Sequence, residues 1–159
     1  MIISVIGDGN PTEKISLLAE EVGTLLAKKG ILIVCGGLGG VMESVCRGAK
    51  KHGGTTIGII PGIKASEANQ WVDIPICTGI SQARNVIIAT TGDAIIAVGG
   101  KYGTLSEISH ALSINKPVIG LNTWNLSQNK NIKPSIIQAQ NPADAVNLAE
   151  RAILNNEQY

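Results

Sequence analysis

The stretch that decides the fold is "ILIVCGGLGGVMES", residues 31–44. Five apolar residues are followed by glycines, and the glycines lead into a segment with helical spacing. A short continuous apolar run is typical of a strand buried on both faces, as the strands of parallel sheets are. Since the same order of strand, turn and helix recurs on both sides of this stretch, we expect βαβ units.

The remaining apolar runs predict further strands at 2–6, 55–60, 72–76, 94–98 and 117–121. Helical spacing between them predicts helices at 11–29, 40–52, 81–91, 104–114 and 142–155. We expect Asn10 to cap the first helix and the helix over 81–91, which is nearly all apolar, to be buried. Right-handed crossovers then give an α/β, Rossmann-like doubly wound parallel sheet with helices on both faces, in a single domain over 1–159.

The composition bounds the class of protein. Of the 159 residues, 44% are hydrophobic and 16% charged, an apolar excess that predicts a homodimer or a higher homo-oligomer. The formal net charge of +1 and the absence of Phe argue against a nucleic-acid partner. No apolar stretch reaches the roughly 18 residues of a membrane span. Three cysteines without a C-x-x-C motif indicate reduced thiols, so we expect a cytoplasmic protein.

In such a sheet the strand-to-helix loops share one edge, where ligands bind. These loops are expected at 7–11, 36–40, 61–80 and 99–103, and the helices that begin near 81 and 104 open on the same edge. Arg84 and Glu107, far apart in sequence, can therefore meet there.

The glycine cluster "GGLGG" (36–40) does not complete a known nucleotide motif. Met42 stands where a dinucleotide-binding loop has its third glycine, and the next strand ends without an acidic residue for a ribose. No G-K-[ST] sequence is present, which argues against a nucleoside-triphosphatase loop. What remains is a backbone that an anion can approach at the start of a helix.

A second glycine-rich stretch, "AVGGKYGTLSEISHAL" (97–112), allows two interpretations. Thr104 and Glu107 form a capping-box pattern, which explains both without a ligand. It leaves the glycines around "KY" unexplained, and these favour close approach of an anion. Arg84, in the first turn of the apolar helix, needs an anionic partner, which is Glu107, Asp93 or a ligand phosphate.

Three motifs in this order carry a family resemblance: "GGLGGVME" (36–43), "TGISQARN" (78–85) and "GGKYGTLSEI" (99–108). The chain resembles, over about residues 2–121, the superfamily known as "possible lysine decarboxylase". Its members include the LOG-type cytokinin-activating phosphoribohydrolases and the molybdenum-cofactor carrier proteins. The "ARN" and "GTLSE" forms are most similar to the carrier branch.

The resemblance implies a set of site residues. In LOG-type enzymes the motif reads P-G-G-x-G-T-x-x-E, so its threonine and glutamate fall on Thr104 and Glu107, and the catalytic arginine on Arg84. This sequence departs at Gly99, where the motif has proline, and at Lys101, where it has glycine. The expected ligand- and phosphate-binding residues are Gly7, Gly36, Gly37, Gly39, Gly40, Gly99, Gly100, Lys101, Gly103 and Thr104.

Three functions stay open at this point. The first is hydrolysis of the N-glycosidic bond of a nucleoside 5′-monophosphate, with Glu107 as the carboxylate and Arg84 positioning the substrate. The second is a binding protein without turnover, which carries molybdenum cofactor or senses a nucleotide. The third is an oligomeric scaffold with a vestigial pocket. We expect no required cofactor and no metal, because no His, Cys or Asp cluster has metal-ligand spacing and nothing indicates a pyridoxal phosphate site.

Overall fold

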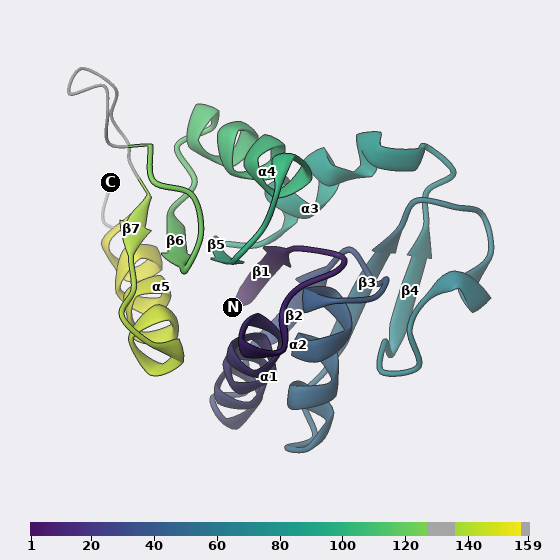
Figure 1. Ribbon diagram of the computed structural model, residues 1–159, viewed down its shortest axis with the longest axis horizontal. Coiled ribbons are helices and arrows are strands. Elements are labelled where there is room, and N and C mark those ends of the chain that lie inside the picture. Colours follow the sequence, from purple (N-terminus) through teal and green to yellow (C-terminus); the bar gives the residue numbers. More distant parts are fainter. Residues whose placement is uncertain (127–135, 157–159) are drawn as a thin grey trace.

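The computed structural model describes residues 1–126 and 136–156, and these form one parallel sheet flanked by helices (Figure 1). The sheet order is β4-β3-β2-β1-β5-β6-β7. The strands are β1 (Ile2–Gly7), β2 (Leu32–Cys35), β3 (Thr56–Ile60), β4 (Ile74–Cys77), β5 (Ala94–Val98), β6 (Val118–Leu121) and β7 (Ile137–Gln138). The predicted doubly wound α/β fold is confirmed.

Helices cover both faces of the sheet. They are α1 (Glu13–Lys28), α2 (Val41–Lys50), α3 (Asn85–Thr91), α4 (Tyr102–Ser113) and α5 (Pro142–Asn156), with short 3-10 turns η1 (Ala65–Glu67) and η2 (Ser81–Arg84). Helices α1, α2 and α5 share one hydrophobic core, and α3 and α4 share the other (Figure 1). The central strand β5 is buried along its whole length, as the apolar runs predict for strands covered on both faces.

The strand order places the functional edge. From β1 the chain runs through β2, β3 and β4 to one side, and it then returns to the other side of β1 as β5. The loops that follow β1 and β5 therefore leave the sheet in opposite directions and flank a crevice. Such a reversal is where open α/β sheets bind ligands.

The start of α1 differs from the prediction. Thr12, not Asn10, is the N-cap, since its hydroxyl accepts a hydrogen bond from the Ile15 N–H at 3.4 Å. The Asn10 N–H donates instead to the Asp8 carboxylate at 3.0 Å. The helix thus begins later because Thr12 stands three residues before an unpaired helical N–H, the spacing that an N-cap requires.

The segment predicted as one buried helix over 81–91 is also different. It opens with the 3-10 turn η2 and continues as α3, whose Ile88 and Ala89 are buried. Val86 and Ile87 are exposed, because a helix on an outer layer can bury only one side. The short strand β7 was not predicted, since two residues are too few to show the alternation of apolar and polar side chains that is typical of a strand.

None of the described helices is long and apolar enough to cross a membrane.

Candidate functional site

A pocket of about 260 Å³ lies at the carboxyl edge of the sheet, between the loops after β1, β2 and β5 and the turn η2. Seven of the predicted site residues line it: Gly7, Gly36, Arg84, Lys101, Gly103, Thr104 and Glu107. The lining also includes residues that were not predicted: Ile6, Asp8, Gly9, Leu38, Met42, Gln82 and Asn85. Gly37, Gly39, Gly40, Gly99 and Gly100 do not line it.

Arg84 and Glu107 meet inside this pocket, as expected. Arg84 comes from η2 and Glu107 from the second turn of α4, and their side chains are only 5% and 8% exposed. The Arg84 Nη1 atom lies 3.8 Å from Glu107 Oε1. That distance gives charge attraction without a hydrogen bond. Arg84 Nε is buried and has no hydrogen-bond partner among the described residues.

Burial sets the protonation of this pair. It raises the pKa of Glu107 to about 7, and the nearby Arg84 charge offsets only part of the effect. Burial also lowers the pKa of Arg84, against the attraction of Glu107. A guanidinium stays charged in proteins, whereas a carboxyl with a pKa near 7 exchanges its proton at neutral pH. The arrangement can therefore act as an acid or a base beside a fixed positive charge.

The capping-box interpretation of Thr104 and Glu107 is wrong. Helix α4 begins at Tyr102, its N-cap is Lys101, and no side chain makes a capping hydrogen bond there. Glu107 is consequently too far along the helix to reach back to the N-cap, and its carboxylate faces Arg84 instead. The helix starts early because Gly99 and Gly100, both with positive φ, turn the chain just before Lys101.

The uncapped start of α4 opens on the pocket. The first backbone N–H groups of a helix have no acceptor within it, and both Gly103 and Thr104 line the cavity. Free N–H groups together with the helix dipole favour an anion at this position. Arg84 adds a buried positive charge to the lining of the same pocket.

Most of the predicted glycines serve the packing of the protein itself. A Cβ atom added at Gly7, Gly40 or Gly100 would collide with backbone or side-chain atoms of neighbouring segments. Gly36 leaves room for the Arg84 guanidinium, which a Cβ would approach within 2.6 Å. Gly40 and Gly100 therefore shape the site without lining the pocket. Gly7 and Gly36 shape the site and also line the pocket.

Gly103 has no such explanation. A Cβ at this position would meet nothing within 4 Å, and its φ is not in the left-handed region. Glycine inside a helix costs about 1 kcal/mol relative to alanine. The space over Gly103 therefore belongs to the pocket. Gly9, in the β1–α1 loop, lines the same pocket and has equally open surroundings.

A second ion pair stands at the mouth of the pocket. Lys101 Nζ lies 3.0 Å from Asp8 Oδ2, with the two side chains 71% and 17% exposed. The Lys101 carbonyl accepts a hydrogen bond from the Trp124 indole at 3.3 Å, and the rings of Tyr102 and Trp124 are 5.8 Å apart. Asp8 was missed, although it follows Gly7 directly in a loop expected at the functional edge.

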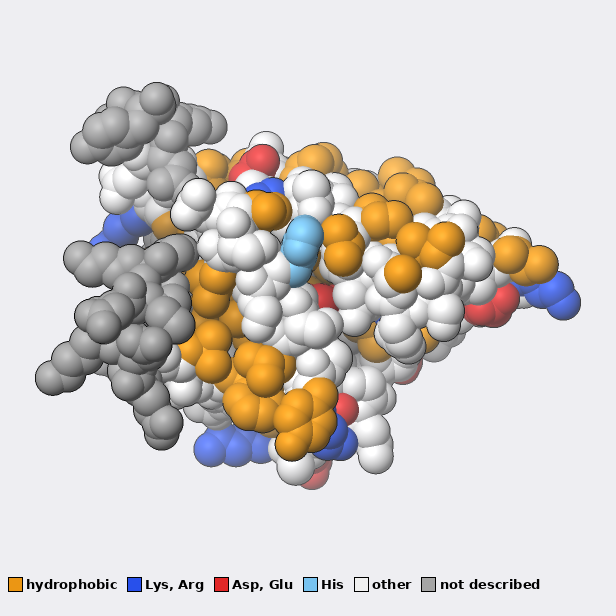
Figure 2. Space-filling model, turned by 90° about the horizontal axis from the view of Figure 1, so that it is seen from above, with side chains coloured by type: hydrophobic (Ala, Val, Ile, Leu, Met, Phe, Trp, Pro, Cys, Tyr) orange, Lys and Arg blue, Asp and Glu red, His pale blue; other side chains and the backbone are white. Residues whose placement is uncertain are grey.

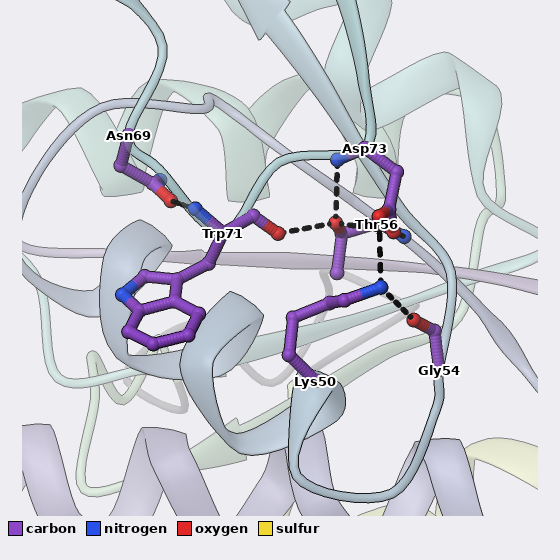
Figure 3. Close-up of polar contacts among 6 residues, drawn as sticks. All are labelled: Lys50, Gly54, Thr56, Asn69, Trp71 and Asp73. Carbon is purple, nitrogen blue, oxygen red and sulfur yellow. Dashed lines mark hydrogen bonds and ion pairs between the residues drawn. The ribbon is translucent and has the colours of Figure 1, made fainter.

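The glycine loop 36–40 is held from outside by Asn69. The Asn69 amide donates to the Leu38 carbonyl at 2.9 Å, and its backbone N–H donates to the Gly37 carbonyl at 2.8 Å. Figure 3 shows how Asn69 is itself fixed by the Trp71 N–H, and how Asp73 joins Thr56 and Lys50 behind it. Nothing in the sequence indicates this brace, because Asn69, Trp71 and Asp73 lie in the irregular segment before β4.

The described residues contain no group of three or more His, Cys, Asp or Glu side chains that could hold a metal ion.

The family is decided by a match to the model of the SLOG cluster4 family over residues 1–146. The chain belongs to this family. A protein of Archaeoglobus fulgidus, described as uncharacterized, is 48% identical over 121 residues, which are 76% of this chain and 80% of that protein. The cytokinin riboside 5′-monophosphate phosphoribohydrolase of Rhodococcoides fascians is 32% identical over 120 residues. That match covers 69% of this chain but only 60% of the enzyme.

Solved structures agree over more of the chain. The molybdenum cofactor binding protein of Rippkaea orientalis superposes with a TM-score of 0.88 at 37% identity, covering 96% of both chains. The molybdenum cofactor carrier protein of Chlamydomonas reinhardtii superposes with a TM-score of 0.84 at 34% identity, covering 96% of this chain and 98% of that one. The resemblance to LOG enzymes and to carrier proteins is thereby confirmed.

Proposed function

We propose that this chain binds a phosphorylated, nucleotide-like or pterin ligand in the pocket at the carboxyl edge of the sheet. The phosphate lies on the free N–H groups at the start of α4, over Gly103 and beside Gly9. Arg84 supplies a buried positive charge, and the apolar side chains of Leu38 and Met42 offer a surface for a heterocycle.

As its specific activity we propose hydrolysis of the N-glycosidic bond of a nucleoside 5′-monophosphate. The observation that carries this proposal is the buried Glu107 carboxyl, with a pKa of about 7, held 3.8 Å from Arg84 in a pocket of about 260 Å³. General acid–base chemistry at neutral pH needs such a value, since it uses a group that both holds and releases a proton there.

The reaction divides between the two residues. Cleavage passes through an oxocarbenium-like sugar, which the ionised Glu107 stabilises while it orients the attacking water. Water adds its oxygen to the sugar carbon and gives a proton to Glu107, while the C–N bond breaks and its electron pair leaves with the base. Glu107 then releases that proton, by way of water, to the departing base. Arg84 positions the substrate and favours charge on the departing base. The start of α4 holds the phosphate and so fixes the sugar within reach of Glu107.

The test is release of free base from a panel of nucleoside 5′-monophosphates, followed by chromatography. We expect Glu107→Gln to lose at least about a hundredfold in rate, as removal of an acid–base group does. Glu21→Gln, on the exposed side of α1, is the matched control and retains the wild-type rate. Release that survives in Glu107→Gln would contradict the mechanism.

A second candidate is favoured by the structural neighbours, which carry or bind molybdenum cofactor and match 96% of the chain. As a carrier, the protein holds the phosphorylated pterin on the same α4 N-terminus and leaves it chemically unchanged. No cofactor is then required for its own chemistry, because the molybdenum cofactor is the cargo. Binding of this ligand with no base release from any nucleotide would select the carrier over the hydrolase.

We also propose that the protein forms a homodimer or a higher homo-oligomer. Figure 2 shows hydrophobic side chains spread along the face that carries α3 and α4. Exposed members on this side include Ile80, Val86, Ile87 and Ile114. Exposed hydrophobic side chains gathered on one face in this way are typical of a subunit contact. Light scattering that gives a monomer at micromolar concentration would refute the proposal.

A further inference from the structure

Asp8 is electrostatically out of place. It is an acidic residue in the lining of a pocket whose other features favour an anion. Partial burial would raise its pKa, but the Asn10 N–H and Lys101 outweigh that effect and hold the pKa below its ordinary value. The side chain is thus a carboxylate at neutral pH. A negative charge at this position opposes phosphate binding unless it has a task of its own.

The two members of the Asp8–Lys101 pair differ in freedom. Asp8 is 17% exposed and is fixed by the hydrogen bond that its Oδ1 atom accepts from the Asn10 N–H at 3.0 Å. Lys101 is 71% exposed, and Asp8 is its side chain's only ion-pair or hydrogen-bond partner among the residues in 1–126 and 136–156. Exposed ion pairs contribute little to stability, so the Lys101 ammonium group can leave Asp8 at small cost, provided that another donor takes its place on the less exposed carboxylate.

We propose that ligand binding exchanges the partners of this pair: Lys101 moves from Asp8 to the ligand phosphate, and the freed Asp8 carboxylate accepts a hydrogen bond from a sugar hydroxyl. The inference rests on the proposed function and names the ligand class more narrowly. It selects phosphate esters that carry a free hydroxyl at C2 or C3 of the sugar, as a ribose 5-phosphate group does, over phosphates that lack one.

The exchange follows from the geometry of both residues. Lys101 is the residue directly before α4, so its side chain stands beside the N–H groups that receive the phosphate. Once it turns to that phosphate, Asp8 Oδ2 loses its partner while Oδ1 keeps Asn10. A partly buried carboxylate oxygen without a donor is costly, and a hydroxyl on the ligand restores the lost hydrogen bond. Ligands without this hydroxyl leave Asp8 unpaired and bind less tightly.

Three probes without a glycosidic bond separate this inference from turnover: inorganic phosphate, ribose 5-phosphate and 2,3-dideoxyribose 5-phosphate. Their affinities are measured by titration calorimetry for wild type, Asp8→Asn, Lys101→Met and the control Glu13→Gln, an exposed acid outside the pocket. We expect wild type to bind ribose 5-phosphate about tenfold more tightly than the dideoxy compound, the scale of one hydrogen bond to a charged group.

The variants have opposite expected effects. In Asp8→Asn the tenfold preference falls to less than about threefold, while inorganic phosphate binds about threefold more tightly because a like charge is gone. Lys101→Met weakens all three probes and keeps the preference for the hydroxyl. Thermal unfolding of each variant confirms that it is folded.

The outcomes also distinguish the inference from the proposed function. Equal binding of the two sugar phosphates by wild type, or an unchanged preference in folded Asp8→Asn, would overturn the exchange and leave the phosphate site intact. Wild-type protein that binds none of the three probes would overturn the phosphate site, and the exchange with it.

Discussion

The pocket contains two ion pairs of opposite character. At its floor, Arg84 and Glu107 are 3.8 Å apart with side chains at most 8% exposed. At its mouth, Lys101 and Asp8 are 3.0 Å apart, and Lys101 is 71% exposed. The shorter pair leaves the pKa of Asp8 below its ordinary value, while the longer pair accompanies a Glu107 pKa raised to about 7.

Burial accounts for this difference more than distance does. Water and nearby donors keep Asp8 charged, so the pair at the mouth consists of fixed charges that a ligand can rearrange. Removal from water destabilises the Glu107 carboxylate more than the attraction of Arg84 at 3.8 Å stabilises it. The floor of the pocket therefore contains a group that titrates near neutral pH. The comparison predicts that the floor contributes to chemistry and the mouth to selection of the ligand.

The largest effect that would test this comparison is the pH dependence of stability in Glu107→Gln. Since the folded-state pKa of about 7 lies above the ordinary 4.5, the native protein holds this proton more tightly than the unfolded chain does. The stabilisation is complete below about pH 4.5 and is lost as the pH rises through about 7. Glutamine resembles the protonated carboxyl, so at pH 8.5 we expect the variant to be more stable by about 3 kcal/mol.

Urea unfolding at pH 4.5, 6, 7 and 8.5 measures this difference, which should vanish at the lowest value. Glu21→Gln, at an exposed position, should follow the wild type at every pH. A Glu107→Gln variant that is less stable than wild type at pH 8.5 would show that the attraction to Arg84 exceeds the cost of burial. The floor pair would then be structural. A gain in stability with a loss of base release is instead the trade-off expected of a functional residue.

A smaller effect, that of Gly103→Ala, tests whether the space between the two ion pairs holds the phosphate. Gly103→Ala removes a helical glycine without a steric conflict, so we expect a gain of about 0.5–1 kcal/mol in the free energy of unfolding. The same methyl group enters the pocket and should weaken binding of inorganic phosphate. Gly39→Ala is the matched control, because its surroundings are equally open but it does not line the pocket. Equal loss of phosphate binding in both variants would contradict the placement of the phosphate over Gly103.

The sequence predicted those parts of this site that depend on the order of strands and loops. Buried strands such as β2 and β5 appear as apolar runs because both of their faces are covered, and this places the loops after them at one edge. The contact between Arg84 and Glu107 could be predicted because both residues lie at that edge. In addition, an arginine in an apolar segment needs an anionic partner. The family resemblance indicated the same two residues independently.

What depends on the exact start of a helix or on contacts across loops could not be predicted. The residues Thr104 and Glu107 allow a helix that begins after Thr104, with a capping box, and equally a helix that begins at Tyr102, without one. Only the turn at Gly100 decides between these two helix starts. The glycines look alike in sequence, yet Gly7 is required by neighbouring atoms and Gly103 is not. Asp8 was missed because its place in the site depends on its ion pair with Lys101, which is distant in the chain.

The smallest effect concerns the stability contributed by the pair at the mouth. We expect Lys101→Met to change the free energy of unfolding by less than about 1 kcal/mol, since an exposed pair gains little in water and orders a long side chain. Salt should remove even this difference, whereas it should leave the pH dependence due to Glu107 largely unchanged, because buried charges are screened less. Urea unfolding at low and high salt makes the measurement, with Lys14→Met, exposed on α1, as the control. A loss well above 1 kcal/mol that persists in high salt would mean that Lys101 and Asp8 hold the two loops together. The pair could not then exchange partners cheaply, and the contrast between the floor and the mouth of the pocket would disappear.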